Sequence, residues 1–475
     1  MSVEQNIVTD TIFELFENQA SGPKYRVLAS ALREGMTQGS LPPGTRLPPV
    51  RDLGWRLGMT PGTVARAYTL LTDEGALVAE VGRGTFVQGE VKRAAPLLLD
   101  PLPREVTESG DRMVSLFTGR IPDLGQVSLV REALARIAAR PAPGLMDYPT
   151  SRAFAPARQA ALDWLSDVPL GQVHHEDLVL SHGAQNGISL VMQAVLRGRR
   201  PVVLVEELCY PGFRRAAELL RAEPVPVPMD EQGIRPDALR DLTRKHEAQL
   251  LCTSPELHNP TTIVTPPERR REIAQVARSC GLHILEDDST FLGQARCETY
   301  RAMLPEQGWF VSSISKTLTP GLRVGFAIAP RARRADLRRA AEYGFFGLAL
   351  PLADLVADLL SRQETRQIVR AVRERNALYV RSTVNFLGGH ELRWSEEAPF
   401  VWLRLPPGWR AAAFCMAAEA KGVQVRAAEE FALRDAFAPH AVRIGMNGQV
   451  PLAEFEQAIL RLRRLLDDPP EQILV

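Results

Sequence analysis

The apolar positions near the start of this 475-residue chain predict three short helices and a β-hairpin. Residues 24–38 place Leu28, Leu32 and Met36 four positions apart, which is the spacing of one helical face. The proline- and glycine-rich turn GSLPPGTRLPP should end this helix, and residues 50–57 predict the second one. Residues 1–21 begin with a polar and acidic stretch, and we interpret them as a short, partly ordered leader.

The third helix is expected to begin just after the tight turn GMT and to run to about Asp73. Thr60 is a natural N-cap residue, and Pro61 suits the first helical position. The stretch LVAEVGRGTFVQ then predicts two strands around a glycine turn. Residues 22–90 are therefore expected to form an α+β winged helix-turn-helix unit. The buried face of its third helix is assigned to Val64, Ala67, Tyr68 and Leu71.

From about residue 113 to the end, strand-like apolar runs alternate with helical patterns. The runs are DLVLSH, PVVLVEE, LLCTS, LHILEDD, GWFVSSIS and RVGFAIAP. Strands that alternate with helices predict an α/β domain with a mostly parallel sheet covered on both faces. Residues 91–112 are rich in proline and charge and are interpreted as a linker, so the chain is multidomain, as its length also suggests.

Composition narrows the class of protein further. The 57 basic and 56 acidic residues leave a net charge of +1, and 45% of the residues are apolar, which excludes a disordered, collagen-like or coiled-coil chain. Residues 22–92 carry nine basic and six acidic residues, so the charge of this unit has the sign that DNA binding needs. The five cysteines lack metal-site spacing, no apolar run reaches the roughly 18 residues of a membrane span, and no signal-peptide core is present. We expect a cytoplasmic protein without a metal site.

Lysine is rare, because it supplies only five of the 57 basic residues and arginine the other 52. Coding bias is the ordinary explanation. Arginine can replace lysine as a surface charge, but it cannot form a Schiff base, so a site that needs a primary amine must keep its lysine. The five lysines are Lys24, Lys92, Lys245, Lys316 and Lys421.

Lys316 lies in the segment SSISKTLTPGLRVG, between a strand-like run and a turn. Its amine could form a Schiff base with an aldehyde cofactor. Ser313, Ser315 and Arg323 supply hydroxyl groups and a guanidinium that suit a cofactor phosphate. An isolated serine–lysine pair is usually part of the surface, but this whole segment at this spacing is specific.

Three other segments, which together with the Lys316 segment resemble those of pyridoxal 5'-phosphate enzymes, imply contacts to the phosphate and the pyridine ring of that cofactor. Backbone N–H groups where SHGAQNGI turns from strand to helix could bind phosphate, although an ordinary turn is the alternative. Asp287 in EDD could keep a ring nitrogen protonated, with Glu286 and Asp288 as solvent-facing or structural neighbours. Asn259 in HNPTT could bond the phenolic oxygen of the ring, and Tyr210 could stack on it or belong to the core. The phosphate-binding turn is assigned to Gly183, Ala184 and Gln185.

The segments LPPGTRLPPVRDLGWRLGMTPGTVARAY, LLTDEGALV and GRGTFV together resemble the GntR family of bacterial regulators. The resemblance implies a recognition helix in the major groove of DNA and a wing beside it. The family often has arginine where Pro61 stands, so base readout should differ here; a protein-docking winged helix is the alternative. The DNA-binding residues implied are Arg51, Thr60, Gly62, Thr63, Arg66 and Gly84.

The segments SHGAQNGI, HNPTT, EDD and SSISKTLTPGLRVG occur in the order typical of pyridoxal 5'-phosphate enzymes with the aspartate aminotransferase fold, called fold-type I. This resemblance implies that Lys316 binds the cofactor, that Arg443 in AVRIGMNG grips a carboxylate, and that a small subdomain spans roughly residues 335–475. It also implies a homodimer in which Tyr148 reaches the partner's phosphate. Ser289 and Thr290 stand where the fold usually has a tyrosine, which argues against efficient transamination.

A GntR-type unit followed by a linker and an aminotransferase-like domain resembles the MocR subfamily of transcription regulators, over about residues 22–465. The resemblance implies a protein that binds a double-stranded DNA operator and senses an amine, an amino acid or pyridoxal phosphate itself. Two alternatives stay open. The chain could be a working aminotransferase with an incidental N-terminal unit, or a regulator that has lost its cofactor.

Overall fold

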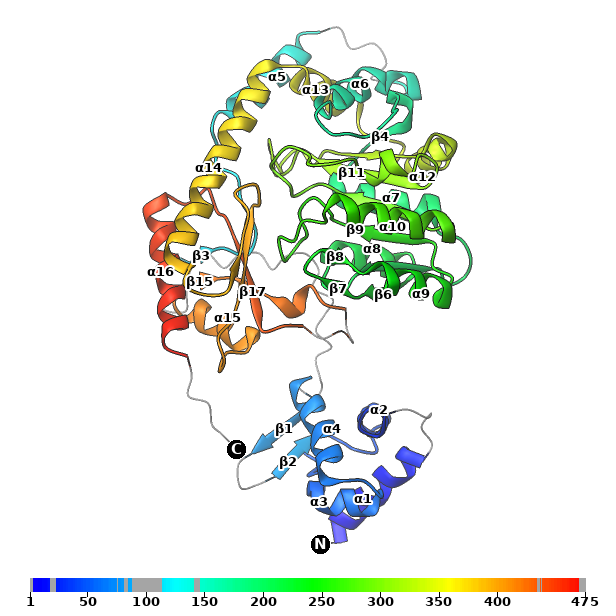
Figure 1. The fold of residues 1–475 in the computed structure, drawn as a ribbon, viewed down its shortest axis with the longest axis vertical. Helices are drawn as coiled ribbons and strands as arrows, with labels where there is room; N and C mark the ends of the chain where they lie inside the picture. Colours follow the sequence, from blue (N-terminus) through cyan, green and yellow to red (C-terminus); the bar gives the residue numbers. More distant parts are fainter. Residues whose placement is uncertain are drawn as a thin grey trace. The chain divides into compact units, whose positions relative to one another are not determined.

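The fold is seen in a computed structural model of the chain. It describes residues 3–17, 23–74, 76–80, 84–87, 113–140, 146–433, 436 and 438–469. The chain forms two compact units, Met1–Leu102 and Pro103–Val475 (Figure 1). The predicted linker, residues 91–112, and the turn of the wing, residues 81–83, lie outside the described residues.

The first unit contains the predicted helix-turn-helix and hairpin. Its β-hairpin is antiparallel, with Leu77 opposite Val87. A single hydrophobic core joins the helices to the hairpin through residues such as Leu28, Leu53 and Val64. The elements are α1 (Val3–Glu17), α2 (Lys24–Gln38), α3 (Val50–Arg56), α4 (Pro61–Asp73), β1 (Leu77–Glu80) and β2 (Gly84–Val87).

Helix α1 differs from the sequence prediction, which interpreted residues 1–21 as a partly ordered leader. Ile12 of this helix is fully buried, and Val8, Phe13 and Phe16 pack against the core of the first unit. Arg56 of α3 forms an ion pair with Asp10 of α1 at 2.9 Å. The apolar residues of α1 recur every three to four positions, but the polar start of the segment obscures this periodicity.

A seven-stranded sheet forms the centre of the second unit, in the order β4-β12-β11-β10-β9-β5-β6. Strand β12 is antiparallel to both of its neighbours, and the other pairings are parallel. The edge strand β6 was not predicted, because Pro224 and Pro226 interrupt it; proline is tolerated at a sheet edge. The strands are β4 (Leu178–Ser181), β5 (Val202–Glu206), β6 (Glu223–Val227), β9 (Leu250–Thr253), β10 (His283–Asp287), β11 (Gly308–Ser313) and β12 (Gly325–Ile328).

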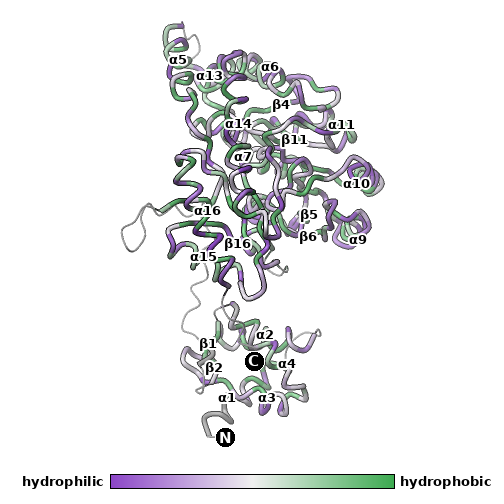
Figure 2. Tube along the Cα trace, turned by 60° about the vertical axis from the view of Figure 1, so that its left-hand side comes forward, coloured by the Kyte–Doolittle hydropathy of each residue, from purple (hydrophilic) through white to green (hydrophobic). Residues whose placement is uncertain are grey.

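Helices cover both faces of this sheet, because alternate strand residues are buried in different cores. Val311 packs in one core with α7, α8 and α12, whereas its neighbour Phe310 packs in another with α5, α6 and α13. Helices α9, α10 and α11 complete the second face, and Figure 2 shows hydrophilic stretches on the outer helices α9 and α10. The helices are α5 (Gln126–Ala138), α6 (Ala155–Trp164), α7 (Gly183–Val195), α8 (Pro211–Leu219), α9 (Pro236–His246), α10 (Pro267–Cys280), α11 (Tyr300–Met303), α12 (Arg334–Phe345) and α13 (Leu350–Leu360).

A smaller subdomain surrounds an antiparallel sheet in the order β13-β14-β17-β16, and β3 pairs with β15 in parallel beside it. Helices α14, α15 and α16 pack on these strands through a separate core (Figure 1). The sequence predicted that this subdomain begins near residue 335. Helices α12 and α13, which lie at and just after that position, pack instead with the large sheet. The elements are β3 (Val114–Ser115), α14 (Gln363–Leu387), β13 (Leu392–Arg393), β14 (Phe400–Arg404), α15 (Ala411–Ala420), β15 (Val423–Gln424), β16 (Arg426–Ala427), β17 (Ala441–Gly445) and α16 (Leu452–Asp467).

Within the described ranges, no helix has the length and apolar character needed to cross a bilayer.

The remaining elements of the second unit are short. The short elements are η1 (Ser151–Phe154), η2 (His175–Asp177), β7 (Met229–Asp230), β8 (Gly233–Ile234), η3 (Arg331–Arg333) and η4 (Ala428–Glu430).

Candidate functional site

The residues assigned to a phosphate gather where β4 and β11 end and the antiparallel strand β12 begins. Ser313 is opposite Gly325 across one ladder, and Gly325 is opposite Ser181 across the next. Helix α7 begins at Gly183, two residues further along the chain. A Cβ atom built on Gly183 would lie 2.8 Å from Arg323 Nη2, so the guanidinium rests directly on the start of this helix. The sheet thus brings together side chains that lie up to 142 positions apart.

The chemistry of this group fits a phosphate. Gly183 has a φ of 76°, which glycine tolerates, and Arg323 has a φ of 51°, a strained value for a non-glycine residue. Arg323 makes no ion pair with any described residue. The N–H groups at the start of the 13-residue helix α7, this guanidinium and the hydroxyl of Ser313 are donors of the kind that bind an anion. Ser315 donates its backbone N–H to the Ser313 hydroxyl at 3.4 Å.

Gln185 and Tyr210, both assigned to the cofactor from the sequence, lie beside the same glycine. A Cβ atom on Gly212 would overlap both side chains, so both lie against that glycine. Gln185 Nε2 donates to the carbonyl oxygen of Gly212 at 2.9 Å. Tyr210 is the N-cap residue of α8, and its ring meets Phe213 edge-on at 5.8 Å. Tyr210 is partly buried, so one part of the ring packs on the core and another stays accessible.

Asp287 ends β10, as predicted, and is 7% exposed. Burial raises the pKa of Asp287 to about 6. Its Oδ1 accepts the backbone N–H of Ser289 at 3.0 Å and also the hydroxyl of Ser289. Ser289, in the place of the usual tyrosine, therefore holds the carboxylate. A protonated ring nitrogen would supply the countercharge that this buried carboxylate favours.

The neighbours of Asp287 have separate structural tasks. Glu286 is fully buried and accepts from Arg270 at 3.4 Å and from the backbone N–H of Tyr300 at 2.7 Å. Burial raises the pKa of Glu286 to about 7. The backbone oxygen of Asp288 accepts the hydroxyl of Ser312 at 3.3 Å, and burial raises the pKa of Asp288.

Asn259 and Arg443 contact each other directly. Arg443 Nη1 donates to Asn259 Oδ1 at 2.7 Å, and both residues are buried. The guanidinium carbon of Arg443 lies 4.9 Å from the ring centre of Phe400 and 4.8 Å from that of Phe431. These rings pack on the guanidinium, and its two terminal nitrogens donate to Asn259 and to the carbonyl oxygen of Phe117.

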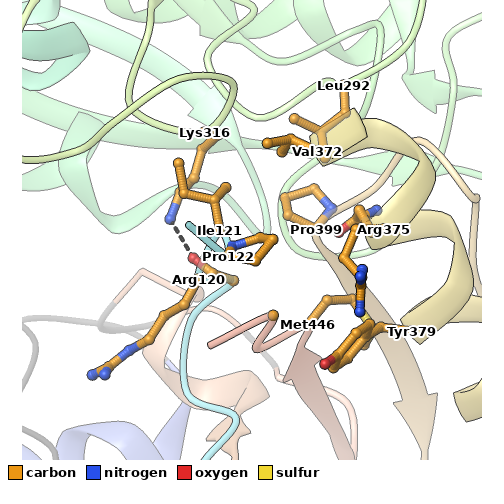
Figure 3. A pocket seen from close by; sticks show the side chains of 13 residues that line it. Arg120, Ile121, Pro122, Leu292, Lys316, Val372, Arg375, Tyr379, Pro399 and Met446 are labelled. Atoms are coloured by element: carbon orange, nitrogen blue, oxygen red, sulfur yellow. Dashed lines mark hydrogen bonds between the residues drawn. The ribbon is translucent and has the colours of Figure 1, made fainter. Parts of the chain in front are cut away.

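Lys316 reaches a segment that sequence reasoning missed. Its Nζ donates to the carbonyl oxygen of Gly119 at 2.8 Å and lies 3.4 Å from the hydroxyl of Thr118. Arg443 Nη2 donates to the carbonyl oxygen of Phe117 at 3.0 Å. Lys316 also lines a partly open pocket with about 320 Å³ of empty space, and Figure 3 shows Arg375 of α14 on the opposite side of this pocket.

A buried carboxyl–imidazole pair also escaped sequence reasoning. Glu206 ends β5, and its Oε1 accepts from the hydroxyl of Thr253 at 2.6 Å and the N–H of Ser254 at 2.9 Å. His258 Nε2 lies 3.5 Å from Glu206 Oε2. Burial raises the pKa of Glu206 to about 8 and lowers the pKa of His258 to about 4, so both are neutral at pH 7. Two features of the sequence could have indicated this pair: Glu206 ends an apolar strand, and His258 directly precedes Asn259.

Tyr148 lies outside this cluster, on the surface. It is 83% exposed, and its ring centre lies 5.7 Å from that of Phe346, which is itself 70% exposed. Met146, two residues before Tyr148, and Tyr343, three residues before Phe346, are also large and exposed.

The recognition helix of the first unit begins as predicted. Thr60 is the N-cap residue, its Oγ1 accepts the N–H of Thr63 at 3.3 Å, and Pro61 is the first helical residue. Gly62 and Arg66 are exposed one turn apart. The guanidinium carbon of Arg66 lies 4.1 Å from the ring centre of Tyr25, which holds the arginine at the helix surface.

Other basic groups lie near this turn. Arg51 is exposed at the start of α3, and Lys24 Nζ lies 3.4 Å from the carbonyl oxygen of Gly58 in the turn between α3 and α4. Gly84 in the hairpin has a φ of 118°, and a Cβ atom there would lie 2.9 Å from Arg46 Nε. Across the described part of the chain, no group of three or more His, Cys, Asp and Glu residues could hold a metal ion.

The fold and the site define a helix-turn-helix unit joined to a domain of the aminotransferase fold, and two family models agree with this division. "Aminotransferase class I and II" matches residues 111–462, and "Bacterial regulatory proteins, gntR family" matches residues 24–87. The chain therefore belongs to the aminotransferase class I and II family and has the architecture of the MocR subfamily of GntR-type transcription regulators.

Known proteins resemble the chain over most of its length. A helix-turn-helix regulator of Bacillus subtilis, YdeF, is 28% identical over 95% of this chain and 96% of its own length. The pyridoxine biosynthesis regulator PdxR of Corynebacterium glutamicum is 26% identical over 77% of this chain and 80% of its own. A solved archaeal alanine:glyoxylate aminotransferase shares the fold, with a TM-score of 0.68 and 21% identity over 76% of this chain and 92% of that protein. The two regulators favour a transcription regulator over an aminotransferase with an incidental N-terminal unit, and the solved aminotransferase shows the shared fold.

Proposed function

We propose that this regulator binds pyridoxal 5'-phosphate at Lys316 and responds there to an amine or amino acid, or to the cofactor itself. The convergence of Arg323, Ser313 and the start of α7 carries this proposal, because these groups make an anion site beside the segment that holds Lys316. When bound, the cofactor supplies an aldehyde for an amine and a ring that withdraws electrons.

Each residue of the site has a separate task in this proposal. The amine of Lys316 provides the covalent attachment, and Arg323 with Ser313 holds the phosphate. Asp287 holds the proton on the ring nitrogen, since its carboxylate is buried and oriented by Ser289. The remaining groups are Asn259 for the ring oxygen, Tyr210 for the ring face, and Gly183, Ala184, Gln185 and Ser315 around the phosphate.

Arg443 is the group that would recognise the effector. Its guanidinium is held between two phenylalanine rings and bonded to Asn259, so a carboxylate that binds Arg443 also affects a neighbour of the ring. An amino acid could then engage Lys316 through its amine and Arg443 through its carboxylate. An amine without a carboxylate would use the first contact alone.

The segment just after the predicted linker offers a route from this site to the first unit. Val114 donates to the carbonyl oxygen of Gly422 at 2.9 Å, and Gly445 donates to that of Leu116 at 2.7 Å, so the segment is bound to the small subdomain. The same segment accepts hydrogen bonds from Lys316 and Arg443. A ligand that changes these contacts, or the closure of the small subdomain, would move the end of the linker. Such coupling requires different affinities for the two conformations.

The first unit is proposed to bind an operator in double-stranded DNA. Arg51 and Arg66 are exposed cations on the two helices of the motif, and DNA phosphates attract such groups. Tyr148, exposed beside Phe346, is proposed to reach the partner's phosphate in a homodimer. The remaining proposed DNA contacts are Thr60, Gly62, Thr63 and Gly84.

Cofactor binding is tested by titrating pyridoxal phosphate into the purified full-length protein. We expect saturable visible absorbance, and reduction with borohydride should leave the pyridoxyl mass on the peptide that contains Lys316. Modification spread over surface lysines, without saturation, would contradict the assignment.

The aminotransferase alternative is tested by turnover. The cofactor-loaded protein is incubated with an amino-acid panel and 2-oxoglutarate, and keto-acid formation is followed. We expect rates far below the roughly 1–100 per second of ordinary enzymes. Turnover in that range, together with no sequence-specific DNA binding, would refute the regulator proposal.

A further inference from the structure

A second pocket lies in the large subdomain between η1, α6, β4 and α12. It is open to solvent on one side, has about 470 Å³ of empty space with that open part included, and is lined by residues that differ from those of the Lys316 site. Its apolar walls include Phe154, Val179 and Leu348, and its polar lining includes Arg158, Arg338 and Glu342. A concave apolar site with a few convergent polar groups is the usual form of a small-molecule site.

Two arginines of this pocket come close together without a carboxylate partner. Arg158 is only 6% exposed, and its guanidinium donates to the hydroxyl and carbonyl oxygens of Ser151 at 3.3 and 2.8 Å. Arg338 donates to the carbonyl oxygen of Glu176 at 2.7 Å. Burial and the charge of Arg338 both lower the pKa of Arg158. Neither arginine forms an ion pair with a residue in the described ranges.

The nearest acidic group offsets this charge only in part, because the carboxylate of Glu176 raises the pKa of Arg158 less than burial and Arg338 lower it. The side chain of Glu176 forms its ion pair with Arg334 at 2.8 Å. Glu342 lines the pocket one helical turn after Arg338 on α12 and is exposed at its rim. A buried cation without a counterion is unfavourable, and an oxyanion that reaches both guanidinium groups would relieve the repulsion between them.

We propose that this pocket is a second effector site, which binds a small apolar amino acid without using the cofactor. The carboxylate lies at Arg158 and Arg338, the ammonium group at Glu342, and the side chain against Phe154 and Leu348. The pair of arginines selects the carboxylate, and Glu342 distinguishes an amino acid from a simple carboxylic acid. The apolar walls select against a charged side chain.

The position of the pocket makes it suitable for regulation. Phe346 lines it and also contacts the exposed ring of Tyr148. The two residues that follow Tyr148 lead into η1, whose Ser151 is held by Arg158. A ligand between α6 and α12 would thus affect the surface that carries Tyr148, far along the chain from Lys316.

The test is isothermal titration of the full-length protein with three probes of similar shape: L-leucine, 4-methylpentanoate and 3-methylbutylamine. We expect saturable binding of L-leucine, weaker binding of 4-methylpentanoate and no binding of the amine. Arg338→Gln should weaken L-leucine binding at least tenfold, whereas Arg334→Gln, on the same helix but paired with Glu176, should leave it unchanged.

One further variant makes the test specific. Glu342→Gln should weaken L-leucine but leave 4-methylpentanoate unchanged, which a merely structural role would not produce. Absence of saturable binding, equal effects of the Arg338 and Arg334 variants, or equal effects of Glu342→Gln on L-leucine and 4-methylpentanoate would each overturn the proposal.

Discussion

Lys316 is the residue whose chemistry no other side chain of the site can supply. Its amine reaches the carbonyl oxygen of Gly119 and the hydroxyl of Thr118, and an arginine there would keep the positive charge but could form no covalent link to an aldehyde. Lysine is scarce, with five residues against 52 arginines, so replacing Lys316 by arginine keeps the charge that is common elsewhere in the chain and removes only the amine.

The first prediction concerns this amine. Lys316→Arg should abolish the visible absorbance of bound pyridoxal phosphate, because a guanidinium forms no Schiff base with an aldehyde. The matched control is Lys421→Arg, in a turn of the small subdomain, which should bind as the parent protein does. An unchanged spectrum in Lys316→Arg would show that the attachment lies elsewhere.

The second prediction concerns Asp287 and pH. Burial raises its pKa to about 6, so the native state binds more protons than the unfolded chain between about pH 4 and 6, and stability falls as pH rises through this window. Asp287→Asn should therefore stabilise the cofactor-free protein by about 3 kcal/mol at pH 8 and by about half of that at pH 5.

Urea unfolding at pH 5 and 8 measures this effect, with Asp241→Asn on α9 as the exposed control. The same Asp287 variant should bind pyridoxal phosphate more weakly, since the countercharge of the ring nitrogen is lost. If Asp287→Asn lowered the free energy of unfolding at pH 8, the carboxylate of Asp287 would not destabilise the cofactor-free protein as predicted.

At the scale of elements, helix α4 shows how local sequence sets a functional surface. Thr60 caps the helix and Pro61 begins it, so the chain turns sharply and presents Gly62 and Arg66 on the outer face. These features were predictable because they depend on neighbouring residues. Helix α1 and strand β6 were not predicted, because a polar start obscured the first and prolines interrupted the second.

The third prediction concerns the cap of this helix. Thr60→Ala should destabilise the first unit by about 1 kcal/mol, because the N–H of Thr63 loses its side-chain acceptor. Thr60→Ser keeps the hydroxyl and is the control. Thermal unfolding of the full chain measures the difference, and equal stability of the two variants would show that the cap contributes nothing.

The fourth prediction concerns Arg51. If it contacts one phosphate, Arg51→Ala should reduce the slope of log K against log salt by about 0.9. Arg33→Ala is the control, because Arg33 is paired with Glu74 on the surface of the same unit. Fluorescence anisotropy with operator DNA over a range of salt gives both slopes. An unchanged slope would remove Arg51 from the phosphate contacts.

At the scale of the whole molecule, the domain order and the motif residues were predictable, but their long-range partners were not. Ser313, Ser315, Lys316 and Arg323 lie in one short segment, so their shared chemistry is visible in the sequence. The contact of Lys316 with Gly119 spans 197 positions, and that of Arg443 with Phe117 spans 326. No local pattern signals such contacts, because the sheet and the small subdomain create them.

These long-range contacts join the candidate site to the segment that follows the predicted linker. One chain combines a GntR-type helix-turn-helix unit with an aminotransferase-like domain, and the residues just after the predicted linker contact both Lys316 and Arg443. An enzyme with an incidental N-terminal unit would not need sequence-specific DNA binding, whereas a regulator does.

The most direct test is selection of bound sequences from a randomised DNA pool by the full-length protein supplied with pyridoxal phosphate. The affinity for the enriched sequence is then compared with that for scrambled DNA at physiological salt. The account predicts enrichment of one sequence and a preference of at least about 10³-fold. Equal affinity for the selected and scrambled DNA would contradict it.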